Sequence, residues 1–162
     1  MMEVKLEGLA LDMTTNTPVV ILAPSEIDKV LPIWIGHAEA WAIAMELSGV
    51  APKRPLTHDL IKRMVETLGG RVEKVEITEL REQTFYAVIH VACNSETYQI
   101  DARPSDSIAL ALKTGSAIFV NKELFTVDIE GSPDQPTMPT DPESLRERLR
   151  KINPEDFGKY SL

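Results

Sequence analysis

The residues best suited to chemistry lie in a short polar segment between a predicted strand and a predicted helix. The segment reads D-A-R-P-S-D-S from Asp101 to Ser107 and holds five polar side chains in seven positions. Pro104 disfavours helical angles at Arg103, and Ser105 is a good residue to cap the helix that follows. Free amides and the dipole at a helix start favour anions. This corner therefore suits a phosphate, or a metal ion that in turn holds a phosphate.

The same residues also fit ordinary helix-start chemistry. Ser105 can cap the helix without binding a ligand, and Asp106 can complement the helix dipole. Asp101 can simply pair with Arg103. Because capping signatures far outnumber catalytic ones, spacing alone leaves a structural role and an anion-binding role both open.

A second group of reactive side chains surrounds the start of a predicted helix that Thr57 is expected to cap. It is the one basic cluster in a chain of net charge -8, and it contains Lys53, Arg54, His58, Lys62 and Arg63. Histidine can exchange a proton near neutral pH, and Asp59 beside it suits either the helix dipole or a metal ion. A cluster of this size also fits a solvated helix surface.

Hydrophobic periodicity indicates which elements position these two segments. Alternation predicts strands over 2–12, 19–22, 30–35, 72–80, 84–93, 98–101 and 117–120. Helical spacing predicts helices over 37–48, 57–68 and 105–114. The first two strands form a predicted hairpin. The strands from 72 to 101 form a predicted antiparallel meander that leads into the polar segment.

The composition limits the classes of protein to which this chain can belong. The chain has 162 residues, 43% of them hydrophobic and 26% charged, which predicts one soluble globular domain. We expect a cytoplasmic protein with no membrane contact, because no apolar run approaches the roughly 18 residues of a membrane helix. Cys93 is the only cysteine, so an internal disulfide and a cysteine-built zinc site are excluded. The negative charge argues against nonspecific wrapping of long nucleic acid.

The C-terminal part of the chain differs in composition. Residues 131–142 are rich in Pro, Asp, Thr and Ser, which predicts a linker of little intrinsic structure. After it, Leu145, Leu149 and Ile152 predict a short helix over 143–152. The predicted organisation is a domain over 1–130, a linker over 131–142 and a tail over 143–162. We expect the tail to dock on the domain or to mediate association.

Three segments of the chain, taken together, resemble the bifunctional nuclease (BFN) domain family of bacteria and plants. They are L-P-I-W-I-G-H-A-E-A-W-A-I at 31–43, K-R-P-L-T-H-D-L at 53–60, and T-F-Y-A at 84–87 followed by I-D-A-R-P-S-D-S-I-A-L-A at 100–111. The resemblance implies a single α+β domain with a mixed, bent β-sheet packed by helices. It also implies a homo-oligomer, with a dimer favoured, and nuclease action on RNA and DNA.

The resemblance also suggests a division of labour among the matching residues. Asp101 and Asp106 would bind Mg²⁺ or Mn²⁺, and Arg103 would clamp a phosphate. His58 would act as general acid or base, with Asp59 as its orienter or as a further ligand. The residues expected to bind the substrate, RNA or single-stranded DNA, are Lys53, Arg54, Lys62, Arg103 and Ser105.

Two other classes of function remain open from the sequence. In the first, the chain is a non-catalytic, oligomeric binding or regulatory module, and the helix start at Ser105 holds an anionic ligand or a carboxylate of a protein partner. In the second, the chain is a structural oligomer whose contacts come from Trp34, Trp41 and the C-terminal helix. The nuclease hypothesis requires the segments around His58 and Asp106 to meet in space.

Overall fold

A computed structural model of the chain describes residues 1–126 and 141–151. The strands are β1 (Met2–Asp12), β2 (Thr17–Pro24), β3 (Leu31–Trp34), β4 (Gly70–Arg81), β5 (Thr84–Cys93), β6 (Glu96–Ala102), β7 (Ala117–Val120) and β8 (Leu149–Lys151). The helices are α1 (His37–Leu47), α2 (Thr57–Thr67), α3 (Pro104–Thr114), the 3-10 helix η1 (Lys122–Phe125) and α4 (Pro142–Arg148). Most of the predicted linker and the end of the predicted tail lie outside the described residues.

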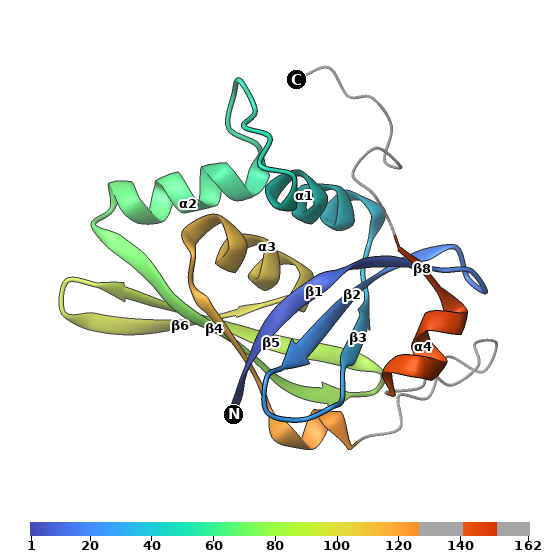
Figure 1. The fold of residues 1–162 in the computed structure, drawn as a ribbon. Coiled ribbons are helices and arrows are strands. Elements are labelled where there is room, and N and C mark those ends of the chain that lie inside the picture. Colours follow the sequence, from blue (N-terminus) through green and yellow to red (C-terminus); the bar gives the residue numbers. More distant parts are fainter. Residues whose placement is uncertain (127–140, 152–162) are drawn as a thin grey trace.

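The strands form one mixed sheet, as expected for an α+β domain. Their order is β3-β2-β1-β7-β4-β5-β6. The short strand β8 also pairs with β1, at the opposite end of β1 from β7. The β4–β7 pair is parallel, and the other described pairs are antiparallel. β7 therefore joins the N-terminal hairpin to the β4–β6 meander, and both of these predicted units are confirmed (Figure 1).

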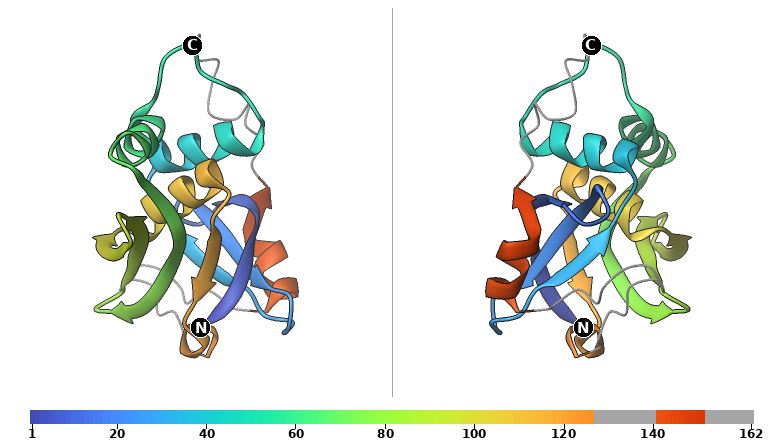
Figure 2. Two further views of the ribbon diagram at one scale, coloured as in Figure 1. Left: turned by 90° about the vertical axis from the view of Figure 1, so that its left-hand side faces the viewer. Right: turned by 90° about the vertical axis from the view of Figure 1, so that its right-hand side faces the viewer.

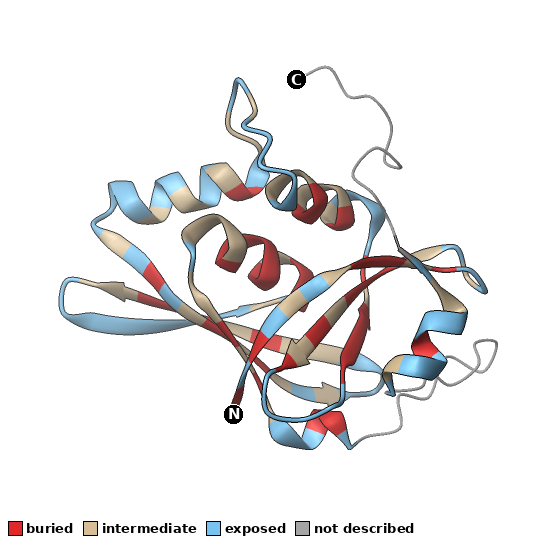
Figure 3. Cartoon of the chain, viewed as in Figure 1, coloured by how far each residue is buried: buried red, intermediate tan, exposed pale blue. Residues whose placement is uncertain are grey.

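The core lies between the sheet and α3. Seven residues of α3 are buried, among them Ile108, Leu110 and two alanines that allow close approach of neighbouring elements. The sheet curves around this helix, while α1 and α2 cover it from the other side (Figures 1 and 2). Figure 3 shows the resulting contrast between a buried α3 and a largely exposed α2. Because α3 contacts both α1 and α2, side chains from these three helices can meet at the ends of α3.

The N-cap residues of two helices differ from the predicted ones by one or two positions. The N-cap of α3 is Arg103, and Pro104 takes the first helical position, where its missing N–H costs nothing. Ser105 therefore lies inside the first turn and does not cap the helix. The N-cap of α2 is Leu56 instead of Thr57, and its backbone N–H donates to Asp59 Oδ2 over 2.9 Å. A carboxylate in the first turn thus replaces the predicted hydroxyl cap.

The predicted helix over 143–152 is wrong at its C-terminal end. α4 stops at Arg148, and Leu149 adopts extended angles (φ -105, ψ 133) that begin β8. β7 covers β1 only at Met2–Val4, so the edge of β1 is open farther along, and β8 pairs there with Ala10–Asp12. Pairing with this open strand edge therefore overrides the local helical pattern. Among the described residues, the helices are too short or too polar to cross a bilayer.

Candidate functional site

Four charged or titratable side chains form a continuous chain of contacts at the start of α3. His58 Nε2 lies 3.0 Å from Asp106 Oδ1, and Arg103 Nε donates to Asp106 Oδ2 over 2.8 Å. The other end of the Arg103 guanidinium forms an ion pair with Glu39 Oε1 at 2.7 Å. These contacts join α2, α3 and α1. The segments around His58 and Asp106 therefore meet, as the nuclease hypothesis required.

The contacts with Arg103 and His58 keep the Asp106 carboxylate ionised. Burial by itself raises the pKa of Asp106, but the hydrogen bonds from Arg103 and His58 outweigh it and lower the pKa below its ordinary value. An ionised carboxylate only accepts hydrogen bonds, so His58 Nε2 must carry the proton of this contact. The same carboxylate, with that of Glu39, raises the pKa of Arg103 above its already high ordinary value.

Glu39 belongs to this chain of contacts, although the sequence pattern assigned it no role. A Cβ added at Gly36 would overlap with Glu39 Oε2, so the glycine lets this carboxylate fold back over the start of its own helix. Glu39 is mostly buried, with 16% of its side chain exposed, whereas 66% of the Arg103 side chain is exposed. The G-H-A-E pattern, a glycine three residues before a first-turn carboxylate, is the signal that could have indicated this residue.

An apolar groove adjoins the chain of contacts. Its volume is about 560 Å³, and Arg103 and Asp106 contribute charged groups to its lining. The apolar side chains that line it include Ile61, Val65, Ile89, Val91, Ile100 and Leu110. The groove therefore lies between α2 and the β5–β6 pair. His58 is only 7% exposed and does not line the groove, so Asp106 and Arg103 are the members of the chain that a ligand in the groove can contact.

Asp59 and Lys62 belong to a second ionic cluster at the other end of α3. Lys113 Nζ lies 2.7 Å from Asp59 Oδ1 and 3.0 Å from Glu46 Oε2. Lys62 Nζ donates to the Lys113 carbonyl over 3.1 Å. Burial raises the pKa of Asp59, but Lys113 and the amide of Leu56 lower it overall. Asp106, and not Asp59, is therefore the carboxylate that orients His58.

The remaining predicted site residues lie around this arrangement without joining it. Ser105 is buried in the first turn of α3. Lys53 and Arg54 are exposed in the loop before α2 and do not line the groove. Asp101 is exposed, and it pairs with Val88 while Ile100 pairs with Ile89. Strand alternation therefore turns the Asp101 side chain to the sheet face opposite Ile100.

The two predicted metal ligands do not form a ready cation site. Both oxygens of Asp106 are already hydrogen-bonded, and Asp101 faces away from it across the sheet. Within residues 1–126 and 141–151, three or more His, Cys, Asp or Glu side chains do not gather in a group that could hold a metal ion. The binding of Mg²⁺ or Mn²⁺ by Asp101 and Asp106 stays a prediction.

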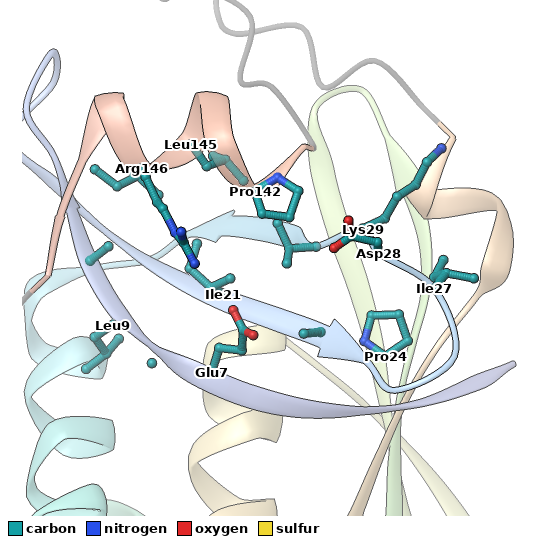
Figure 4. A pocket seen from close by; sticks show the side chains of 15 residues that line it. Glu7, Leu9, Ile21, Pro24, Ile27, Asp28, Lys29, Pro142, Leu145 and Arg146 are labelled. Carbon is teal, nitrogen blue, oxygen red and sulfur yellow. The ribbon is translucent and has the colours of Figure 1, made fainter.

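A second cavity, of about 520 Å³, lies between the β1–β2 hairpin and α4 (Figure 4). Its lining mixes charged and apolar side chains, among them Glu7, Lys29, Arg146, Ile21 and Leu145. The predicted site residues do not contribute to it. Of these two cavities, the groove beside Asp106 is the one that predicted site residues line.

Comparison with known proteins gives concordant matches. Residues 20–129 match the family model described as the bifunctional nuclease domain. An uncharacterized protein from Mycobacterium tuberculosis is 38% identical over 162 residues, which covers 96% of this chain and 97% of that protein. The proteins named Bifunctional nuclease 1 from Oryza sativa subsp. japonica and Arabidopsis thaliana are each 27% identical over 116 residues, 70% of this chain. The chain spans about a third of those two plant proteins, 35% and 36%.

Proposed function

We propose that this chain, which belongs to the bifunctional nuclease domain family, hydrolyses phosphodiester bonds of RNA and single-stranded DNA at the groove beside Asp106. The observation that carries the proposal is the contact of His58 with Asp106, because it joins two separate family motifs into one site. The matched region, residues 20–129, includes each predicted site residue. The relatives named as bifunctional nucleases support the same class of activity.

The proposed chemistry assigns distinct roles to Arg103, Asp106 and His58. Hydrolysis needs an activated water and stabilisation of the charge that develops on the phosphate. Arg103, whose side chain is largely exposed, binds the phosphate with guanidinium N–H groups. Asp106 accepts a hydrogen bond and then a proton from the attacking water. The water oxygen bonds to phosphorus as the P–O bond to the sugar oxygen breaks, and the departing oxygen takes a proton from solvent. His58 acts through Asp106, because its Nε2–H fixes the orientation of that carboxylate.

Predicted partners and conditions complete the proposal. Lys53, Arg54 and Lys62 supply positive charge for the rest of the nucleic acid, which an acidic chain needs locally. A divalent cation, Mg²⁺ or Mn²⁺, would neutralise the same polyanion when bound. The cytoplasm and a homo-oligomeric state remain the predicted setting.

The test is cleavage of end-labelled RNA and single-stranded DNA by highly purified protein, with and without added Mg²⁺ or Mn²⁺. We expect Asp106→Asn to lower the rate about 100-fold or more, as for loss of a group that transfers protons. Arg103→Met should raise KM and lower kcat. Arg71→Met, which removes another exposed arginine paired with a carboxylate, should change neither.

A matched histidine separates positioning from simple destabilisation. His90 is as buried as His58, 7% exposed, and its Nε2 lies 2.7 Å from Glu76 Oε2. His58→Gln and His90→Gln should therefore destabilise the protein similarly, but only His58→Gln should reduce cleavage and shift its pH profile. Equal activity in wild type, Asp106→Asn and His58→Gln would refute the site and indicate a contaminating nuclease.

The second candidate function is a non-catalytic module that binds an anion. It is favoured by the internal pairing of Asp106 and of Arg103, which leaves the site electrostatically balanced before any ligand arrives. Under this alternative, a short oligonucleotide should raise the melting temperature without being cleaved. Arg103→Met should abolish the shift, whereas Asp106→Asn should leave it or increase it.

A further inference from the structure

The Arg103 guanidinium is divided between two carboxylates. Its Nε donates to Asp106 Oδ2 over 2.8 Å, and its Nη2 lies 2.7 Å from Glu39 Oε1. A guanidinium binds a phosphate most strongly through two parallel N–H groups on one edge. Nη2 belongs to both edges that offer such a pair, one with Nε and one with Nη1. The Glu39 carboxylate therefore competes with a phosphate for either mode of binding.

Of the two carboxylates, that of Glu39 is the one that a ligand can displace. Asp106 is held from its other side by His58 Nε2 at 3.0 Å, and it lies in the helix turn that Arg103 begins. Glu39 comes from a different helix and lies in the first turn of α1. Unpaired amides and the helix dipole stabilise a negative charge at that position. The Glu39 carboxylate therefore keeps a favourable environment when the guanidinium turns to a ligand.

Gly36 serves the position of this carboxylate. Its angles, φ -70 and ψ 158, are ones that any residue adopts, so the backbone itself does not require glycine. A Cβ at this position would overlap with Glu39 Oε2. The space left by the missing side chain is therefore occupied by the carboxylate. Because the Glu39 side chain is also mostly buried, its contact with Arg103 differs from a loose surface ion pair.

The three charged groups give this part of the site a net negative charge. Arg103 carries a positive charge, whereas Asp106 and Glu39 each carry a negative one. The whole chain has a net charge of -8. A phosphate that approaches Arg103 is therefore repelled, in addition to meeting an occupied guanidinium. Loss of the Glu39 charge would balance the three groups.

We propose that Glu39 is an internal competitor for phosphate at Arg103 and thereby sets which anions the site accepts. This inference rests on the proposed binding of phosphate by Arg103. A nucleic acid binds by displacing the Glu39 carboxylate, and the same carboxylate returns to Arg103 as the cleaved product leaves. Glu39 is thus a specificity-determining residue and takes no part in proton transfer.

The competition lowers the affinity of every phosphate that uses Arg103 by the same factor, but its consequence depends on the ligand. Inorganic phosphate has no second contact, so it stays largely unbound. A nucleic acid chain is also held by basic residues, and its next phosphate then meets Arg103 at a high effective concentration. Arg54 is four residues before His58, so their Cα atoms are at most about 14 Å apart. That span holds several phosphates of one strand.

Titration with inorganic phosphate at constant ionic strength tests the competition without requiring cleavage. Calorimetry gives the dissociation constant, and the rise in melting temperature gives an independent check. Glu39→Gln should bind phosphate about 10-fold to 100-fold more tightly than the wild type, as expected when a charged hydrogen bond no longer competes. Gly36→Ala, which displaces the carboxylate but keeps its charge, should act in the same direction. Glu39→Gln/Arg103→Met should lose the gain.

Glu46→Gln is the matched control. Glu46 also lies on α1 and also pairs with a cation of α3, because its Oε2 is 3.0 Å from Lys113 Nζ. The substitution removes the same charge from the same helix without touching Arg103, so phosphate affinity should not change. In the cleavage assay, Glu39→Gln should lower KM for oligonucleotides. Inorganic phosphate should inhibit this variant at a concentration about 10-fold lower than it inhibits the wild type.

Three results would overturn the proposal: no gain in phosphate affinity in Glu39→Gln, an equal gain in Glu46→Gln, or a gain that Arg103→Met does not remove. The nuclease function is judged separately. If the wild type cleaves no nucleic acid but the affinities follow the expected order, the nuclease function fails and the competition at Arg103 stands. If the wild type cleaves and the affinities do not differ, the competition fails and the nuclease function stands.

Discussion

Replacing Arg148 by Met should remove a large part of the protein's stability, because Arg148 is the partner of a fully buried carboxylate. Asp12 is 0% exposed and accepts hydrogen bonds from Trp34 Nε1 (2.9 Å) and the Thr14 amide (3.0 Å). Arg148 Nε donates to Asp12 Oδ1 over 3.3 Å, and a terminal guanidinium nitrogen of Arg148 donates to Asp12 Oδ2 over 3.1 Å. Methionine keeps most of the aliphatic length, so the change removes charge and hydrogen bonds more than packing.

The magnitude follows from what remains around Asp12. Removing one partner of a buried ion pair typically costs about 3–5 kcal/mol, because the other charge stays buried and unpaired. Trp34 and Thr14 still donate in the variant, so we expect a loss near the lower limit, about 3 kcal/mol. In the double variant Asp12→Asn/Arg148→Met, no buried charge is left unpaired. The two losses should therefore be non-additive by about 2 kcal/mol.

The assay is urea unfolding at several pH values. Burial raises the pKa of Asp12, but its hydrogen bonds to Trp34, Arg148 and Thr14 outweigh this and lower the pKa overall. The stability from this group is complete above the unfolded pKa of about 3.9 and is lost as the pH falls through the lower folded value. The gap between wild type and Arg148→Met should therefore narrow in acid. A loss under about 1 kcal/mol at neutral pH would refute the reasoning, since that is the cost of a surface pair.

Three further results are expected from the ionic contacts at the two ends of α3. Lys113→Met, which leaves two carboxylates at the end of α3 without their cation, should lower the free energy of unfolding by about 3 kcal/mol in urea titration. Gly36→Ala should push the Glu39 carboxylate away from Arg103, and it should strengthen oligonucleotide binding in parallel with Glu39→Gln, because the guanidinium is freed for the phosphate, as measured by fluorescence anisotropy. Asp106→Asn should flatten the loss of stability in acid, because the lowered pKa of Asp106 makes its contribution fade as the pH falls below about 4.

Local sequence pattern predicted most of the elements, since their hydrophobic periods are clear. Both ends are confirmed for the strands predicted at 84–93 and 117–120. The helix predicted to end at Thr114 does end there. The pattern failed at Leu149–Lys151, where the helical spacing of Leu145 and Leu149 was overridden by an open strand edge on β1. Such an edge exists only after distant strands have paired, so no local window can contain it.

The candidate site divides in the same way between sequence and tertiary structure. Residue identity and short spacing were sufficient to indicate the family, the polar start of α3 and the presence of His58 in the first turn of α2. The contact partners depend on the folding of the whole domain: Asp106 with His58, Lys113 with Asp59, and Glu39 with Arg103. Each pair joins helices far apart in the chain. Which carboxylate meets which cation depends on how α1 and α2 cross α3, and that crossing is set by packing on the shared core.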